Sequence, residues 1–137
     1  MKREPILKKY TLISLLIFLS GCTDKNQIVD DRWYTYAQID KGADIFKNNC
    51  ASCHGDNAQG TTPDNPAPAL NGTAHAWHHP LKMLRQSVRN GSIPLGGTMP
   101  PFKDKLNADE IDASIAFFQS QWKDEIYEAW IKRGALK

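Results

Sequence analysis

The chain has 137 residues with 17 basic and 15 acidic side chains, giving a formal net charge of +2, and its length suits one domain. Four of the basic residues and one acidic residue lie in the first 21 positions. The remainder therefore carries 13 basic against 14 acidic groups, a net charge of −1. Because basic residues are not in excess, the composition gives no reason to predict a nucleic-acid partner.

Residues 1–21 predict a signal peptide. Basic residues at positions 2, 3, 8 and 9 precede an apolar stretch from Tyr10 to Leu19, which is too short to span a bilayer as a mature helix. Leu-Ser-Gly-Cys at positions 19–22 resembles a bacterial lipobox. We therefore expect cleavage before Cys22 and acylation of its thiol, which would anchor the protein stably to a membrane.

Two alternatives to the lipoprotein interpretation are an uncleaved membrane anchor and an ordinary signal peptide with an unlipidated Cys22. The expected location is a periplasm-facing membrane surface of a bacterium. Thr23 follows the cysteine in place of the aspartate that often retains lipoproteins at the inner membrane of enteric bacteria. This mildly favours the outer membrane over the inner one.

Residues 22–36 predict a polar, lipid-anchored tether, followed by one domain over residues 37–137. Trp33, Tyr34 and Tyr36 are unusual in a pure linker, and their rings could pack onto the domain.

A first helix is predicted from Tyr36 or Gln38 to Asn49, because apolar residues recur there at helical spacing. Gly42 lies on the apolar face and allows another backbone to approach closely.

This helix leads into Cys50-Ala51-Ser52-Cys53-His54, a C-x-x-C-H run that is the attachment site of a c-type haem. Two thiols at this spacing can each add across one vinyl group of the same porphyrin, and the adjacent imidazole can bind the iron. A redox dithiol would need a βαβ pattern around it, and a zinc site would need a second cysteine pair. We predict one covalent haem c, held by Cys50 and Cys53, with His54 as an axial iron ligand.

Three further helices are predicted, at 80–90, after Asn107 and at 124–132. The helix after Asn107 opens with Asn-Ala-Asp-Glu, a capping-box pattern. Irregular segments at 55–72 and 92–105 join the helices. Loops of this length are uncommon in a compact domain unless something orders them. A haem, with its two large apolar faces, could pack against these loops and order them.

Met99 is the predicted second axial ligand. It follows Gly96 and Gly97, which permit a tight approach, and it precedes Pro100, which disfavours helical geometry at the residue before it. Met83, the other methionine after the signal peptide, falls in a helical pattern and is predicted to fill core space.

Three histidines compete with Met99 for a metal. His75, His78 and His79 could hold copper or zinc, or one of them could complete a bis-histidine iron. We favour the simpler interpretation, in which they are polar loop residues at the surface or near a haem propionate.

From Gln38 to Trp122 the chain resembles class I monohaem cytochromes c. The landmarks of this resemblance are Gly42, Phe46, the Cys50–Gly55 run, Pro68-x-Leu70-x-Gly72, Met99-Pro100 and Phe117-Phe118. The resemblance implies an all-α fold with roughly three to five helices around one covalent haem. The first and last core helices would cross.

By the same resemblance, Gly42 and Phe46 would contact Phe117 or Phe118. The Pro68 carbonyl would accept a hydrogen bond from the far nitrogen of His54 and raise the basicity of its ring. Two features depart from the family pattern. Phe117 stands where tyrosine is frequent, and residues 123–137 form a helical extension, expected to cover the core.

The resemblance implies a one-electron carrier, not an enzyme, with no catalytic residues and no small-molecule substrate. Two protein ligands, His54 and Met99, would leave the iron only electrons to exchange. Its partners would be a reductase and an oxidase met through small transient interfaces. The alternatives are a haem-based gas or redox sensor with a labile or histidine sixth ligand, and a copper-binding protein using His75, His78 and His79.

Overall fold

The computed structural model describes residues 24–61 and 67–137. The predicted signal peptide and Cys22 lie outside these residues. The described part contains α1 (Tyr36–Asn49), α2 (Ala51–His54), α3 (Leu81–Asn90), α4 (Ala108–Gln119) and α5 (Asp124–Lys132), with 3₁₀ turns η1 (His75–His78) and η2 (Ile93–Leu95). Its β-pairing is limited to one isolated bridge. The all-α prediction is therefore confirmed.

None of the helices in residues 24–61 and 67–137 is long and apolar enough to cross a membrane.

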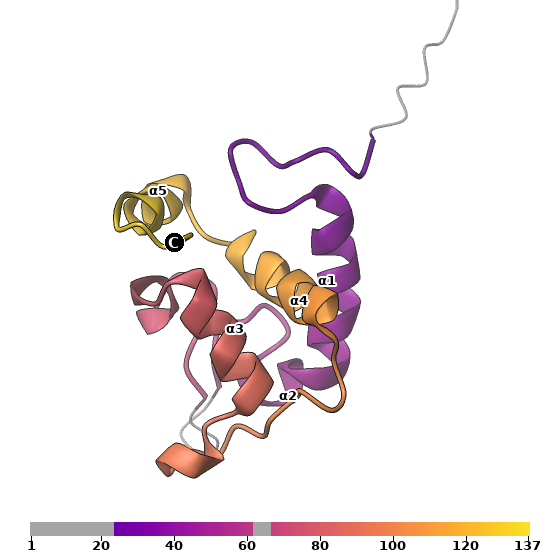
Figure 1. Cartoon of the computed structure of the whole chain (residues 1–137), viewed down its shortest axis with the longest axis vertical. Coiled ribbons are helices and arrows are strands. Elements are labelled where there is room, and N and C mark those ends of the chain that lie inside the picture. Colours follow the sequence, from indigo (N-terminus) through magenta and orange to yellow (C-terminus); the bar gives the residue numbers. More distant parts are fainter. Residues whose placement is uncertain (1–23, 62–66) are drawn as a thin grey trace, which may run out of the picture.

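α1 and α4 cross at the centre of the molecule (Figure 1). Gly42 is buried at the crossing, where a Cβ atom would overlap the carbonyl group of Ala113. One turn later the Phe46 ring, 1% exposed, lies 5.0 Å from the Phe117 ring between centroids. The crossing that the resemblance implied is present, and a glycine permits it because no side chain fits between the two backbones.

Capping boxes begin both crossing helices. The Thr35 hydroxyl accepts from the amide of Gln38 at 3.2 Å, and the Gln38 side chain accepts from the amide of Thr35 at 2.9 Å. Asn107 and Glu110 form the same reciprocal pair at the start of α4. The second box is as predicted, whereas the first decides that α1 begins at Tyr36, because each box satisfies two amide groups that lack helical partners.

α3 corrects one prediction. Leu81, Leu84 and Val88 turn into the core, and each is at most 9% exposed. Met83 is 46% exposed, so it does not fill core space. The reason is helical geometry, since a residue two positions after Leu81 points to nearly the opposite side of the helix.

The C-terminal extension packs onto the domain through Trp130, which is 1% exposed. The Trp130 indole N–H donates to the carbonyl of His79 at 2.7 Å. Beyond α5, the Ala135 carbonyl accepts from the amide of Leu81 at 2.9 Å. The extension therefore covers the core, as expected, and also ties the start of α3 to the end of the chain.

Residues 24–35 lie against α5, and we call these two segments together the cover. Tyr34 is 1% exposed, and the Trp33 indole donates to the buried side chain of Gln119 at 2.6 Å. The Trp33 amide donates to the hydroxyl of Tyr127 at 3.0 Å. Trp33 and Tyr34, the two aromatic residues just before α1, thus pack onto the domain, while Tyr36, the first residue of α1, stays 38% exposed.

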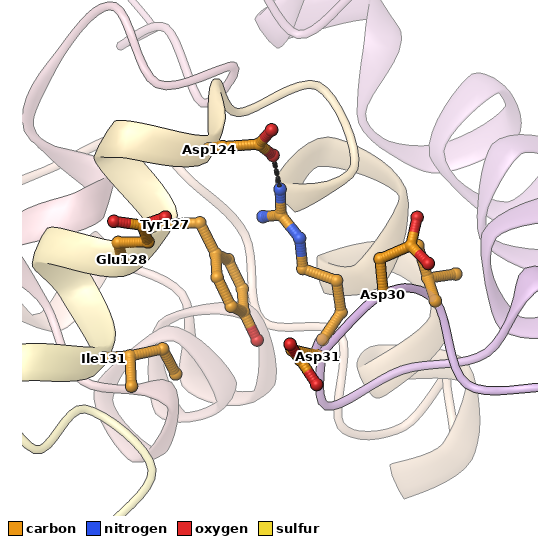
Figure 2. Close-up of a pocket in the computed structure, with 8 residues that line it drawn as sticks. Asp30, Asp31, Asp124, Tyr127, Glu128 and Ile131 are labelled. Carbon is orange, nitrogen blue, oxygen red and sulfur yellow. Dashed lines mark hydrogen bonds and ion pairs between the residues drawn. The ribbon is translucent and has the colours of Figure 1, made fainter.

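A surface pocket of about 450 Å³ lies within the cover. The Arg32 guanidinium donates to the Asp124 carboxylate and lies over the Tyr127 ring; Figure 2 shows Asp124 and Tyr127 in this pocket. The guanidinium sits 3.9 Å from the centroid of that ring. Asp30, Asp31 and Glu128 complete an acidic lining, and no predicted haem-binding residue takes part.

Candidate haem site

The two cysteines lie on one helical turn directly after α1. The Cys50 amide donates to the carbonyl of Phe46 at 2.8 Å and closes α1, and the Cys50 carbonyl accepts from the amides of Cys53 and His54 at 3.1 and 2.9 Å. Neither cysteine forms a disulfide. The turn therefore keeps both sulfur atoms and the imidazole on one short, rigid element, as attachment to a single porphyrin requires.

Burial raises the pKa of the Cys50 thiol to about 11, the neighbouring Cys53 adds to the shift, and Lys105 opposes it. Before the haem is attached, the Cys50 sulfur is therefore a protonated thiol at neutral pH. This form is less reactive toward oxidants than a thiolate, which favours keeping the sulfur available for the porphyrin.

His54 is held by one hydrogen bond to the loop that follows it. The ring is buried, and its Nδ1 lies 2.9 Å from the carbonyl oxygen of Pro68. A carbonyl can only accept, so Nδ1 carries the proton and Nε2 keeps its lone pair. In this arrangement an acceptor that does not itself touch the metal orients a histidine for metal binding, and the Pro68 carbonyl takes the part that the resemblance implied.

The loop that carries Pro68 is anchored on two sides. The Ala58 carbonyl accepts from the amides of Leu70 and Asn71 at 2.7 and 3.1 Å. On the other side the Trp122 indole donates to the carbonyl of Leu70 at 2.7 Å. No local sequence pattern marks Ala58 or Trp122, so neither residue is predicted from the sequence to belong to the site.

Met99 lies in a loop that closes on itself. The Met99 carbonyl accepts from the amide of Ser92 at 2.9 Å, and the Met99 amide donates to the Ser92 hydroxyl at 3.1 Å. Gly91 has a φ of +67°, and a Cβ there would overlap the Met99 carbonyl. The Met99 side chain is half-buried against the core. These hydrogen bonds thus fix the backbone of Met99 within the loop, and glycine at position 91 is needed for the loop to close.

The rings of His75 and His78 lie 5.5 Å apart between centroids, but the three histidines around η1 do not form a metal site. His75, His78 and His79 are exposed, and the His78 ring stacks on Trp77 with centroids 4.0 Å apart. No three or more His, Cys, Asp or Glu side chains form a possible metal site within the described ranges. The structure therefore favours the interpretation of these histidines as surface residues.

The donor set fits a covalent haem. Two thiols and an imidazole with a free Nε2 come from one turn, and a thioether is held on a separate loop. Together with the crossing of α1 and α4, these features define a class I monohaem cytochrome c, a haem-based electron carrier.

The comparisons with known proteins specify this class further. The chain belongs to the family described as "Cytochrome C oxidase, cbb3-type, subunit III", whose profile matches residues 37–118. Its cofactor is accordingly one covalent, iron-containing haem c. The matched segment includes α2, α3 and all but one residue each of α1 and α4, but neither part of the cover.

Three relatives illustrate the range of this similarity. The cbb3-type cytochrome c oxidase subunit FixP of Sinorhizobium medicae is 31% identical over 88 residues, covering 60% of this chain and 29% of that protein. FixP of a Bradyrhizobium species is 34% identical over 79 residues, covering 58% and 26%. Cytochrome c6 of Bryopsis maxima is 31% identical over 85 residues, covering 58% of this chain and 86% of that protein.

The chain thus spans under a third of the FixP subunits and most of the small cytochrome. No solved structure matches the chain significantly.

Proposed function

We propose that this cytochrome passes single electrons between redox proteins at a membrane surface, through a haem iron ligated by His54 and Met99. The observation that carries the proposal is the hydrogen bond from His54 Nδ1 to the Pro68 carbonyl, 2.9 Å long. This bond commits one ring nitrogen and leaves the other for iron. The double contact between Met99 and Ser92 supports a methionine as the opposite ligand.

The residues of the chain have separable tasks in this function. Cys50 and Cys53 would hold the porphyrin covalently, while His54 and Met99 would both bind the iron and so exclude substrates from it. The haem supplies a one-electron iron couple, and a methionine ligand raises its reduction potential. Ligands held by fixed loops change little between the two oxidation states, which keeps the energetic cost of electron transfer low.

The proposed partners are a reductase and an oxidase that meet the carrier transiently. Similarity to a subunit of cbb3-type oxidases supports an oxidase as one of them. Acylation of Cys22 would confine the carrier to the membrane surface where such partners lie.

The absorption spectrum of the ferric protein tests the ligation. We expect the weak far-red band that methionine sulfur gives to ferric haem, and we expect the reduced protein to resist carbon monoxide. Met99→Ala should abolish the band and admit carbon monoxide readily. Met83→Ala is the matched control, because it removes a methionine that is 46% exposed on α3.

Three outcomes would contradict the ligation. Rapid carbon monoxide binding by the unmutated protein would identify an open or labile sixth position, as in a gas sensor. A Met99→Ala variant that kept the band would exclude Met99. Absence of the band with resistance to carbon monoxide would direct attention to His75, His78 and His79 as the sixth ligand.

Membrane fractionation of the Cys22→Ala variant tests the anchoring. We expect the variant to leave the membrane fraction with an unchanged haem spectrum, since Cys22 lies far from the C-x-x-C-H run in the sequence. A variant that still sediments with membranes would refute acylation of Cys22 as the anchor.

A further inference from the structure

Trp122 lies beyond the segment that the family profile matches, yet it contacts the loop next to His54. Its indole is 3% exposed, and its Nε1–H donates to the carbonyl oxygen of Leu70 at 2.7 Å. Leu70 is two residues after Pro68, the acceptor of the hydrogen bond from His54. The Trp122 indole is therefore connected to the His54 ring through its hydrogen bond to Leu70, the backbone from Leu70 to Pro68, and the hydrogen bond between Pro68 and His54.

Further contacts restrict movement of the backbone around Leu70. The amides of Leu70 and Asn71 donate to the Ala58 carbonyl, so hydrogen bonds that do not involve Trp122 hold the segment as well. Two residues after Leu70, a Cβ added to Gly72 would lie 3.2 Å from the indole ring of Trp122. The backbone thus meets the indole at Leu70 and at Gly72, and neither point can shift without breaking a hydrogen bond or moving the ring.

The cover in turn fixes Trp122. The Trp130 ring lies 5.8 Å from the Trp122 ring at 86°, an edge-to-face arrangement of the kind that stabilises aromatic pairs. Trp130 is 1% exposed and is held by its own bond to the His79 carbonyl. Packing of α5 is thereby transmitted to the loop beside His54 through two indole rings.

We propose that Trp122 is a positioning residue that holds the Pro68 carbonyl against His54 and so adjusts the reduction potential of the iron. This inference rests on the proposed ligation by His54. A firm acceptor at Nδ1 makes the imidazole a stronger electron donor and favours ferric iron. If the loop relaxes, that acceptor weakens and the potential rises.

The experiment compares the holoproteins of Trp122→Phe and Trp130→Phe by potentiometric titration. Each variant replaces a buried indole with a phenyl ring and removes one hydrogen bond of 2.7 Å, but only Trp122 bonds to the loop that carries Pro68. We expect Trp122→Phe to raise the midpoint potential clearly more than Trp130→Phe does. Amide hydrogen exchange at Leu70 and Asn71 should also accelerate more in Trp122→Phe.

An equal shift in the two variants, no shift, or a lower potential in Trp122→Phe would overturn the inference, because general loosening of the core would then explain the data. If Trp122→Phe does not fold, Gly72→Ala presses on the indole while retaining it. Gly134→Ala is its matched control, since both glycines have positive φ, +91° and +74°, and only Gly72 touches Trp122. The potential of Gly72→Ala should rise above that of Gly134→Ala, and equal potentials would again overturn the inference.

Failure of the ligation itself would be visible separately. It would show in the unmutated protein as carbon monoxide binding or a missing far-red band, whatever the variants do. An unmutated protein with the expected spectrum, combined with equal potentials in the two tryptophan variants, would leave the ligation intact and refute only the role of Trp122.

Discussion

Different interactions stabilise the haem end of the molecule and the cover. The haem end consists of α2, the loop around Pro68 and the segment 91–106, which meet at the lower end of Figure 1. There, short backbone hydrogen bonds hold loops in place, and Leu95 remains 88% exposed. The cover lies at the opposite end and is built from buried aromatic rings, with Tyr34 and Trp130 each 1% exposed.

This difference indicates where the prosthetic group contributes to stability. Loops with few buried side chains of their own open readily unless another component covers them, and at the haem end we expect the haem to be that component. The cover has an aromatic core made by the polypeptide alone. Loss of haem should therefore loosen one end of the molecule far more than the other.

The largest expected effect comes from removing both haem attachments. Cys50→Ala combined with Cys53→Ala should abolish covalent haem, so that all haem is extracted into acidified organic solvent. Amide hydrogen exchange should accelerate strongly in residues 91–106 and around Pro68, and much less in α5. Ser52→Ala, on the same turn, is the control. Equal acceleration at both ends would contradict the division into two differently stabilised regions.

The next largest effect tests the aromatic core of the cover. Trp130→Ala should lower the free energy of unfolding by about 3–5 kcal/mol, because it leaves a large cavity in a buried site. It also leaves the His79 carbonyl without the indole donor. Guanidinium unfolding followed by circular dichroism measures the change. Ile131→Ala, at a position 36% exposed on the same helix, should cost far less, and similar costs for the two variants would refute a core centred on Trp130.

The two capping boxes allow a smaller, matched comparison. Thr35→Ala and Asn107→Ala should each lower the free energy of unfolding by about 1 kcal/mol, since each leaves helix amides without an acceptor. Thr35 joins the cover to α1, whereas Asn107 joins the haem-end segment to α4. Exchange should therefore accelerate around residues 24–35 in the first variant and around 91–106 in the second. The same exchange pattern in both variants would show that the two regions open together.

The smallest change in the free energy of unfolding at neutral pH is expected for Tyr34→Phe. This substitution should affect stability only at alkaline pH. Burial raises the pKa of Tyr34 from its ordinary value of 10 to about 12; the neighbouring Tyr127 adds to the shift, and Arg32 opposes it. Because the folded state disfavours the phenolate, the stabilisation is complete below pH 10 and is lost as the pH rises through about 12. Tyr34→Phe should remove this part of the alkaline loss of stability, measured by unfolding at stepped pH. Tyr36→Phe, at an exposed position, should not, and identical profiles for the two variants would count against a buried phenol at position 34.

Local patterns in the sequence determined much of this protein. The bounds of α5 and the capping box at Asn107 are visible in short stretches of residues, because helix capping and helical periodicity act over a few positions. The C-x-x-C-H run at 50–54 identified the cofactor for the same reason, since one porphyrin sets the spacing of its two thiols. The family resemblance added the contact of Phe46 with Phe117 and the bond from His54 to Pro68, both of which the structure contains.

The tertiary structure decided what depends on residues far apart in the chain. Met83 matched a helical pattern and was wrongly placed in the core, because the pattern does not say which side of α3 meets the other helices. Trp33 bonds to Gln119 and Trp122 to Leu70 across separations of 86 and 52 residues. Such pairs form only when the packing of whole elements brings them together, and no periodicity relates positions so distant. The connection from the cover to His54 therefore belongs to the fold, while the haem attachment site itself is a property of the sequence.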